Sequence, residues 1–442
     1  MSGLGQELHG HVEALFPICR SITGTGLRQT LRYISDRIGL EIHEVPSGTP
    51  VLDWEVPEEW TVRGARIERL NGETVVDFRD NNLHLVQYSL PVDRVVPREE
   101  LDRHLHSLPD QPDLIPYRTG YYARSWGFCL TQNQRDAMQD EAYRVVVDTS
   151  LAPGALSYGE LFLPGESGEE FLFSIHCCHP SLANDNLASI AVAMALADSQ
   201  KRRNGRKLGL RFVFLPGTIG AITWLARNRD TVGRIRHGLV LSCLGDAGGL
   251  TYKRSRRGDA PVDRYATHVL AEEGFAERVL PFIPYGYDER QYCSPGFNLP
   301  VGCLMRSPNG SFPEYHTSAD NPSLVKPESL EHSLMALERV VAMAEADYIP
   351  LNMQPYGEPQ LGRRGLYKAI GGQHDQEDAR ARFDQMTVFW VLNLADGTHS
   401  LLDIAERAGK PFPAVAAAAR ALSEAGLLVP AEGRTIGQDR AG

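Results

Sequence analysis

The stretch FLFSIHCCHPSLANDNLASIAVAMALADSQ, residues 171–200, decides the fold. It opens with a short aromatic and aliphatic run that is typical of a buried strand, and it closes with small apolar residues that favour a helix. A polar turn with histidines, two adjacent cysteines and an aspartate separates the two. Strand, polar turn and helix in this order form the repeating unit of a sheet whose faces are covered by helices.

The same alternation continues across residues 151–345. Strands are expected in EEFLFSIHC, LGLRFVFLP, HGLVLSCLG and LPVGCLMR, and helices in LASIAVAMALADSQK, GAITWLARNRD and DRYATHVLAEEG. Short, almost wholly apolar runs are typical of strands buried on both faces of a mostly parallel sheet. We therefore predict an α/β layered core made of residues 1–48 and 151–350.

Two further segments differ from this pattern. Residues 49–150 alternate apolar and polar positions and are punctuated by turn residues, which predicts a small β-rich domain inserted into the core. Residues 380–435 contain a helix, a short helix, a turn at Gly409, a third helix and a short hairpin. That order predicts a C-terminal winged helix.

Composition limits the kinds of partner that we expect. The 442-residue chain has a formal net charge of −11, which argues against broad nucleic-acid binding because such binding needs clustered Lys and Arg. The third helix of the winged helix, FPAVAAAARALSEAGL, has one arginine and no lysine, so we expect it to dock on protein. A homo-oligomer formed through the C-terminal or the inserted domain is the expectation that follows.

The chain also carries features that bear on its location. Seven cysteines, an odd number scattered over a long chain, fit a reducing cytoplasm better than a disulfide framework. The N-terminus lacks the pattern of a secretory signal, and no apolar run reaches the roughly eighteen residues of a membrane span. We expect a cytoplasmic protein without a membrane segment.

Four chemically competent residues follow the ends of three different expected strands, with two of them after the strand FLFSI. They are His179, Asp185, Asp246 and His316. Because the carboxyl ends of parallel strands meet at one edge of a sheet, these side chains can converge. Two imidazoles and two carboxylates suit Zn²⁺ or a similar divalent ion, with room for a water molecule.

Each of these residues also has a structural interpretation. Asp185 precedes a helix of small residues and can serve only as an N-cap. His316 can be an ordinary loop histidine, and His176, at mid-strand, is more often a hydrogen-bonded core histidine than a ligand. Cys177 and Cys178 are adjacent in a strand and point to opposite faces, so we expect them to be small core residues.

Five blocks of the sequence resemble the bacterial aminopeptidase-like protein group, which combines a zinc-aminopeptidase core with an inserted β-domain and a C-terminal winged helix. The blocks are CRSITGTGLRQTL at 19–31, HPSLANDNLAS at 179–189, GYDERQYCSPGFNLPVG at 286–302, YHTSADN at 315–321 and LNLADGTHSLLDIAERAG at 392–409. The resemblance covers nearly the whole chain. It implies that His179 and Asp185 are the first histidine and the bridging aspartate of the metal site, Asp246 a later ligand and His316 the last one.

One element of the pattern is missing. The related zinc aminopeptidases place two glutamates after the next strand, the first a general base and the second a ligand, and the closer group keeps one in a PETIG-like turn. Here the turn reads LPGTIGA, with Gly217 at the base position and Thr218 at the second. The loss of a ligand favours one ion over two. Glu289 and Glu314, near the expected site in sequence, are the candidate replacements for the base.

The polar run at 288–292 is the candidate substrate wall. A run of charges is often only a solvated face, but this one lies between two expected strands next to the site. Arg290 can pair with a carboxylate, and so can Arg306 after the following strand. Asp288 or Glu289 can hold an α-ammonium group. The predicted substrate-contacting residues are Asp288, Glu289, Arg290, Gln291, Tyr292 and Arg306.

Two functions follow from these residues. The first is zinc-dependent hydrolysis of an amide in a small amino-acid or peptide-like substrate, in the manner of an aminopeptidase. The second is a metallopeptidase scaffold that has lost hydrolysis with the glutamate at position 217 and serves in binding, assembly, or acyl or group transfer in a biosynthetic pathway. A DNA-binding regulator is disfavoured by the charge of the C-terminal segment.

Overall fold

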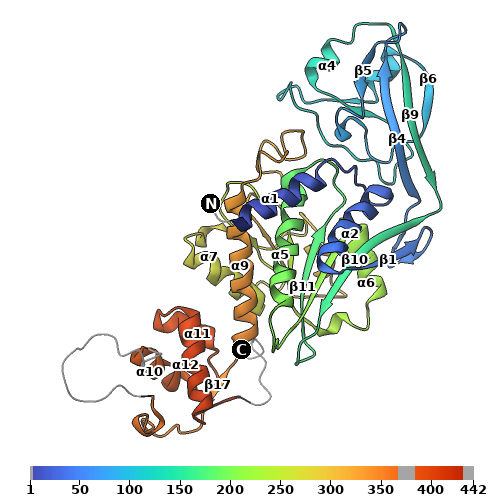
Figure 1. Ribbon diagram of the computed structural model, residues 1–442. Helices are drawn as coiled ribbons and strands as arrows, with labels where there is room; N and C mark the ends of the chain where they lie inside the picture. Colours follow the sequence, from blue (N-terminus) through green and yellow to red (C-terminus); the bar gives the residue numbers. More distant parts are fainter. Residues whose placement is uncertain (1–2, 367–383, 432–442) are drawn as a thin grey trace. The chain divides into compact units, whose positions relative to one another are not determined.

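The computed structural model describes residues 3–366 and 384–431 and divides into two compact units, residues 1–340 and 341–442. The first unit contains the large sheet with its helices and the segment expected as an insertion (Figure 1). Among the described residues, no helix is both long and apolar enough to cross a membrane.

An eight-stranded sheet forms the core of the first unit. Its strands, in spatial order, are β1 (Glu41–Pro46), β10 (Ala155–Leu163), β12 (Gly209–Leu215), β11 (Glu170–His176), β13 (Ile235–Leu241), β16 (Val301–Met305), β14 (Thr251–Lys253) and β15 (Val279–Leu280). The central strands β12, β11, β13 and β16 pair in parallel, and antiparallel pairing begins at β10 and at β14. Every residue of β11, β12 and β16 is buried, as strands covered on both faces require. The predicted mixed α/β fold with a mostly parallel sheet is confirmed.

Helices cover this sheet. They are α1 (Gly3–Leu15), α2 (Thr25–Ile38), α5 (Ser189–Lys201), α6 (Ile219–Arg227), α7 (Pro261–Glu272), α8 (Glu289–Tyr292) and α9 (Pro327–Ala346). Helix α5 packs on β11 and contacts α1 and α2, while α7 packs on β13, β14 and β16. The chain steps from β11 to β12 through α5 and back past β11 to β13 through α6. Right-handed crossovers in opposite directions put α5 and α6 on different faces of the sheet.

Residues 49–150 contribute an antiparallel sheet of their own. Its order is β5 (Thr74–Asp77), β4 (Glu59–Glu68), β9 (Ala142–Ala152) and β6 (Val92–Pro97). The shorter elements of this segment are β2 (Pro50–Val51), β3 (Trp54–Glu55), α3 (Arg98–Asp102), β7 (Leu105–His106), β8 (Phe128–Cys129) and α4 (Gln132–Asp136). One hydrophobic cluster contains Trp60 and Tyr143 of this segment together with Val240 and Tyr292 of the main sheet region. The segment therefore packs directly on the core.

Beyond the end of α9, the described part of the second unit contains three α-helices and two short strands. They are β17 (Pro350–Asn352), α10 (Gln385–Leu394), α11 (Leu401–Ala408), α12 (Phe412–Glu424) and β18 (Leu428–Pro430). Ser400 caps α11 through a capping box with Asp403, and Gly409 ends it in the left-handed conformation, as the expected turn requires. The expected hairpin after the third helix differs: β18 pairs with β17, which precedes the helices. The ends of the predicted segment, residues 380–383 and 432–435, lie outside the described residues.

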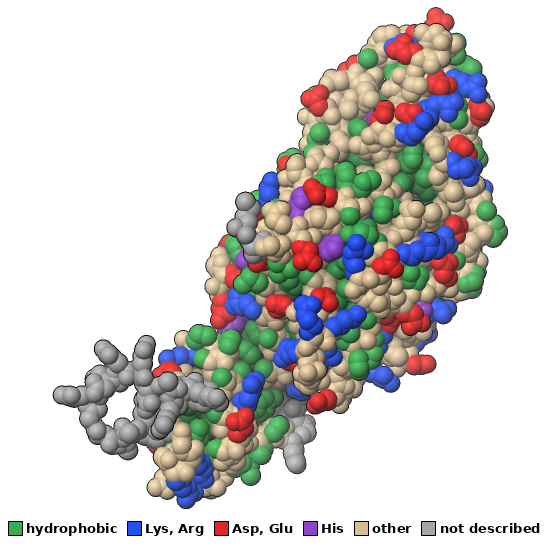
Figure 2. Space-filling model, in the orientation of Figure 1, with side chains coloured by type: hydrophobic (Ala, Val, Ile, Leu, Met, Phe, Trp, Pro, Cys, Tyr) green, Lys and Arg blue, Asp and Glu red, His purple; other side chains and the backbone are tan. Residues whose placement is uncertain are grey.

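Acidic and basic side chains are mixed on the surface of the first unit. On the face shown in Figure 2, Lys and Arg side chains alternate with Asp and Glu side chains. Arg28 of α2 pairs with Glu59 of β4 at 2.6 Å, and Arg63 of β4 pairs with Asp148 of β9 at 2.6 Å. Partly exposed pairs of this kind contribute about 0–1 kcal/mol each. The fold therefore depends on its buried core more than on these charges.

A candidate metal centre at the carboxyl edge of the sheet

The loops that follow four central strands share an unusual backbone. Ser181, Thr218, Cys243 and His316 follow β11, β12, β13 and β16, and they have φ values of 44°, 62°, 49° and 55°. Non-glycine residues in this left-handed region cost about 1–3 kcal/mol each, and such residues concentrate at functional sites. These loops therefore indicate that the functional site lies at the carboxyl edge of the sheet.

A buried aspartate holds the turn that carries Asp185. The turn is η2 (Ala183–Ala188), and its backbone leaves the helical region at Asp185 and Asn186. The carboxylate of Asp320 accepts hydrogen bonds from the amides of Asn184 (2.6 Å) and Asp185 (3.0 Å). Burial raises the pKa of Asp320 to about 7, an effect that the amide of Asn184 opposes. The position of Asp185 is thus set by a partner from a distant loop.

Three imidazoles surround the carboxylate of Asp185, which is completely buried. Its Oδ1 lies 2.7 Å from Nε2 of His176 and 3.6 Å from Nδ1 of His179. Its Oδ2 lies 3.0 Å from Nε2 of His316. The structure therefore brings together His179, Asp185 and His316, three of the four residues in the predicted metal set, and adds His176.

The hydrogen bonds of His176 assign it a supporting role. The side-chain oxygen of Asn186 accepts from the amide of Cys243 (3.1 Å), and its nitrogen donates to the carbonyls of Leu241 (3.0 Å) and His176 (3.2 Å). That orientation points the Asn186 amino group at Nδ1 of His176 (3.0 Å), which must accept. Nε2 then carries the proton and donates to Asp185. With this proton position His176 orients the carboxylate, while its ring also lies with His179 and Asp185 in a group whose donor atoms are within 4.8 Å of one another.

The charges of the cluster fit a divalent cation. Burial lowers the pKa of His179 to about 3, partly offset by Asp185, so this imidazole is neutral at neutral pH. Burial alone would raise the pKa of Asp185, but His179, together with His176 and His316, lowers it well below its usual range. A buried carboxylate beside the neutral imidazole of His179 is a negative charge that a bound cation would offset. Two nitrogen donors and a carboxylate are the ligands of an open zinc site.

Asp246, the fourth residue of the predicted metal set, has other partners. Its Oδ1 accepts from the amide of Gly248 (2.7 Å) and the hydroxyl of Ser307 (2.7 Å). Its Oδ2 accepts from the side chain of Asn184 (2.9 Å). In this arrangement Asp246 fixes the neighbouring loops, and its role as a ligand stays a prediction.

Tyr287 fills the space beside the missing glutamate. Its ring stacks on His176 with centroids 3.6 Å apart, and its hydroxyl lies 3.4 Å from Nδ1 of His179. A Cβ atom on Gly217 would lie 3.3 Å from this ring. Tyr287 is not among the site residues predicted from the sequence, although it lies directly before the polar run. Its position in the GYDERQY block is the feature of the sequence that could have indicated a role in the site.

The inserted segment supplies a second aromatic residue that was not selected from the sequence. The ring of Tyr117 meets His179 and His316 edge-on, with centroids 5.0 Å and 5.1 Å away. Its amide donates to the carbonyl of His316 (2.8 Å), and its hydroxyl lies 2.9 Å from that of Tyr121. The insertion therefore forms one wall of the candidate site and holds the last histidine.

The run at 288–292 is not a solvated face. Asp288, Glu289 and Tyr292 are buried, and only Arg290 and Gln291 are half-exposed. Tyr292 donates to the hydroxyl of Ser174 (2.9 Å) inside the core. Substrate contact thus remains open as a prediction mainly for Arg290 and Gln291.

Asp288 contacts the LPGTIGA turn, which has Gly217 and Thr218 where glutamates are expected. Its Oδ1 accepts from the amide of Thr218 at 2.6 Å, and its Oδ2 is buried without a partner among the described residues. Burial raises the pKa of Asp288 to about 7, opposed by the Thr218 amide, and the charge of Glu289 adds to the rise. Asp288 is therefore buried too deeply to meet the α-ammonium group of a bound substrate without rearrangement.

The candidate replacement bases and Arg306 lie in different surroundings. Glu289 is completely buried and forms an ion pair with Lys253. Glu314 is half-buried. Among the described residues, no hydrogen bond or ion pair links its carboxylate to the histidines around Asp185. Arg306 is 6% exposed, and its guanidinium donates to the carbonyls of Gly248 (2.6 Å) and Ser329 (3.3 Å). Catalytic and substrate roles for these residues stay predictions.

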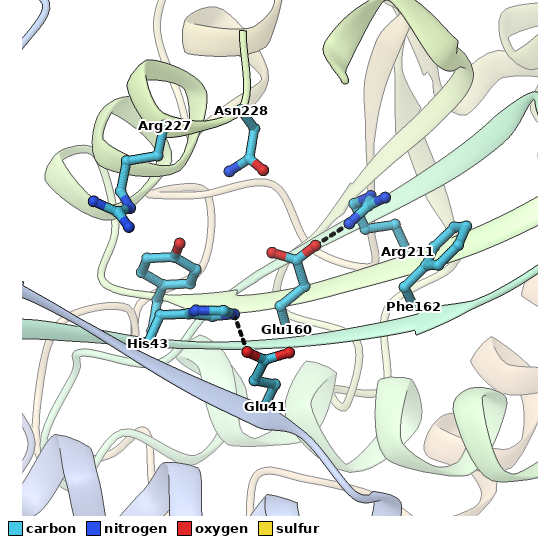
Figure 3. A pocket seen from close by; sticks show the side chains of 8 residues that line it. Glu41, His43, Glu160, Phe162, Arg211, Arg227 and Asn228 are labelled. Atoms are coloured by element: carbon cyan, nitrogen blue, oxygen red, sulfur yellow. Dashed lines mark hydrogen bonds and ion pairs between the residues drawn. The ribbon is translucent and has the colours of Figure 1, made fainter. Parts of the chain in front are cut away.

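A separate pocket of about 340 Å³ lies on the main sheet where β1, β10 and β12 meet the end of α6 (Figure 3). Its buried charges satisfy one another. Arg211 pairs with Glu160 and with Glu170, and the indole of Trp224 donates to Glu160 (2.9 Å). These contacts account for the charged side chains of the pocket without a bound ligand.

Comparison with known proteins first defines the class. The zinc aminopeptidase of Bacillus subtilis superposes with a TM-score of 0.56 at 11% identity, covering 77% of this chain and 94% of that structure. At this identity the likeness shows the fold alone. The chain has an aminopeptidase-like α/β fold, and a winged helix-turn-helix family model matches residues 348–430.

The chain belongs to the family of the domain of unknown function DUF4910, whose model matches residues 9–347. A Clostridium acetobutylicum protein named for polysaccharide biosynthesis and an aminopeptidase-like domain is 47% identical over 427 residues, 97% of either chain. A crystal structure from the same organism, named as a peptidase, superposes with a TM-score of 0.89 at 45% identity, covering 96% of each chain. The predicted resemblance to the aminopeptidase-like group is confirmed.

Proposed function

We propose that this protein is a zinc-dependent enzyme that acts on an amide of a small amino-acid or peptide-like substrate. One observation carries the proposal. The completely buried carboxylate of Asp185 is contacted by His316, flanked by His179 and oriented by His176. His179, Asp185 and His316 would hold one ion and leave a position open, as catalytic zinc sites do.

The residues around the cluster support amide chemistry. A bound zinc ion polarises a carbonyl and lowers the pKa of a water molecule. Tyr287, with its hydroxyl beside His179, can donate a hydrogen bond to an oxygen in the site. Tyr117 forms an aromatic wall against His179 and His316. The name of the 47% identical relative supports a place for the reaction in polysaccharide biosynthesis, on an amide-bearing small precursor.

A second candidate function is binding, assembly or group transfer without hydrolysis. It is favoured by the absence of a glutamate at Gly217 and by the engagement of Glu289 with Lys253. Without a carboxylate to accept a proton, amide hydrolysis loses about 10²–10⁴-fold in rate. The same ion site would then hold a substrate for another reaction.

Metal content and turnover together test the proposal. The metal content of the purified protein is measured by mass spectrometry for the native chain, His179→Ala and the control His43→Ala, and all three are assayed with aminoacyl anilides. One zinc per chain with turnover, both lost in His179→Ala and kept in His43→Ala, is the expected result. Zinc without turnover on anilides favours the second function. A native chain that binds no zinc contradicts both.

A further inference from the structure

The block CRSITGTGLRQTL, which the candidate metal centre does not explain, lines a pocket of its own. The pocket has a volume of about 200 Å³ and lies between the start of α2 and strand β4. No residue that lines it is charged. Its polar walls include Ser21, Thr23, Thr25, Gly26, Gln29 and Thr61.

Helix α2 begins at this pocket, and no side chain caps its N-terminus. Its N-cap is Gly24, which has φ 93° and offers no side chain to the helix. A Cβ atom at Gly24 would lie 2.4 Å from the carbonyl of Trp60, so a capping side chain has no room. Within the described chain, the amides of Thr25, Gly26 and Leu27 have no hydrogen-bond acceptor. The positive end of a 14-residue helix therefore faces the pocket with free donors.

A second group in the wall also lacks a partner. Ser21 is 2% exposed, and its hydroxyl oxygen is buried with no hydrogen bond to any described residue. Leaving a buried polar group unpaired is unfavourable, and native proteins normally pair such groups with protein, water or a ligand. Ser21 also lines the pocket, so its hydroxyl has no competing partner among the described residues that form this wall.

The charges near the pocket favour an anion. Arg20, between two wall residues in sequence, is completely buried and donates to the carbonyls of His179 (2.9 Å) and Leu15 (2.6 Å). Carbonyls do not neutralise its charge. Glu59, which precedes Trp60 of the wall, is ion-paired with Arg28 at 2.6 Å. The pocket is thus free of acidic side chains, and a buried cation follows Cys19 of its wall in the sequence.

We propose that this pocket binds a phosphoryl group of a small-molecule ligand. Helix N-termini bind such anions through their free amides and dipole. A phosphoryl group has enough oxygens to accept from the amides of α2 and from Ser21 and Thr25 at once, which a carboxylate cannot do. The site is separate from the proposed metal centre, and Arg20 connects the two by donating to the carbonyl of His179.

A single added charge tests the proposal. Gln29 is exposed on α2 and lines the pocket, so Gln29→Glu changes the charge there with little effect on the helix. Gln139→Glu, at an exposed glutamine outside the pocket, is the matched control. Binding of inorganic phosphate is measured by calorimetry, with acetate as a second probe. We expect phosphate to bind more tightly than acetate, at least tenfold more weakly to Gln29→Glu than to the native chain, and equally well to Gln139→Glu.

Ser21→Ala provides an independent measurement. Loss of one hydrogen bond should weaken phosphate binding about threefold to tenfold, while the melting temperature without phosphate stays equal or rises because an unpaired hydroxyl is removed. Unchanged phosphate binding in both Gln29→Glu and Ser21→Ala, acetate binding as tight as phosphate, or no phosphate binding by the native chain would each overturn the proposal.

Discussion

A Cβ atom on Gly217 would lie 3.3 Å from both Cε1 and the hydroxyl oxygen of Tyr287. The resemblance to zinc aminopeptidases puts the general-base glutamate at this position. The phenol, stacked on His176, now occupies the volume that a longer side chain at position 217 would enter. A glutamate at position 217 would therefore compete with the Tyr287 ring for this space.

We expect Gly217→Glu alone to gain less activity than Gly217→Glu combined with Tyr287→Ala, because the carboxylate needs the space that the phenol fills. The double variant should exceed the native chain by about 10²–10⁴-fold in kcat/KM on an aminoacyl anilide. The measurement is steady-state turnover of zinc-loaded protein. Gly217→Gln with Tyr287→Ala is the control, since glutamine matches the size but accepts no proton.

A Gly217→Glu single variant as active as the double variant would contradict this account, since Tyr287 would then not restrict the site. Equal activity of the glutamine control and the glutamate variant would show that volume rather than basicity is responsible.

The assignment of His176 as an orienting residue predicts a graded effect on zinc affinity. His176→Phe removes the hydrogen bond to Asp185 but no ligand, so we expect zinc binding to weaken about 10–100-fold. His179→Ala removes a ligand and should abolish measurable binding. Competition with a chromophoric chelator gives both affinities. Equal loss in the two variants would make His176 a ligand.

The sequence was sufficient to predict the edge of the sheet at which the site lies. Parallel strands that end in polar loops bring those loops together, so His179, Asp185 and His316 could be grouped from their places after β11 and β16. The fully buried pattern of β11 and β12 follows from their apolar runs. These features depend on residues that are neighbours in the chain, so a single sequence is enough to predict them.

The remaining features of the site depend on contacts between distant segments. Tyr117 reaches His316 only because the inserted segment folds back on the core, and no periodicity indicates that. The proton position on His176 depends on the orientation of the Asn186 amide, which is set by the carbonyl of Leu241 at the end of β13 and by the amide of Cys243, two residues further on. The burial of Asp288 and Glu289 depends on a partner amide and on Lys253. A charged run in a sequence carries none of this information.

Variants of Tyr117 test whether the inserted segment takes part in the site. Tyr117→Leu keeps an apolar side chain but removes the ring that packs on His179 and His316, so zinc affinity should fall about tenfold, as loss of supporting contacts around a metal site does. Tyr117→Phe keeps the ring and should bind zinc as the native chain does. The measurement is the same chelator competition. Equal zinc affinity in the leucine and native proteins would show that the insertion supports the fold without acting on the metal site.

A last prediction concerns the acid stability of the core. His237 of β13 is 7% exposed, packs near Phe171 and Tyr265, and leaves its Nδ1 without a hydrogen bond to any described residue. Burial lowers its pKa to about 3, with Lys207 and Arg236 adding to the effect. An unfolded histidine titrates near pH 6.5, so below that pH the unfolded chain binds one more proton than the folded chain.

The free energy of unfolding should therefore fall by about 1.4 kcal/mol for each pH unit below 6.5 on account of His237 alone, until the folded pKa is reached. His237→Phe removes this proton and keeps a ring of similar size, so the variant should lose about 2–3 kcal/mol less than the native chain between pH 7.5 and pH 4.5. Urea unfolding at both values measures the difference, and the comparison at pH 7.5 accounts for changed packing. If the free energy of unfolding fell equally in the two proteins between these pH values, His237 would take up its proton in the folded state, which would contradict the prediction.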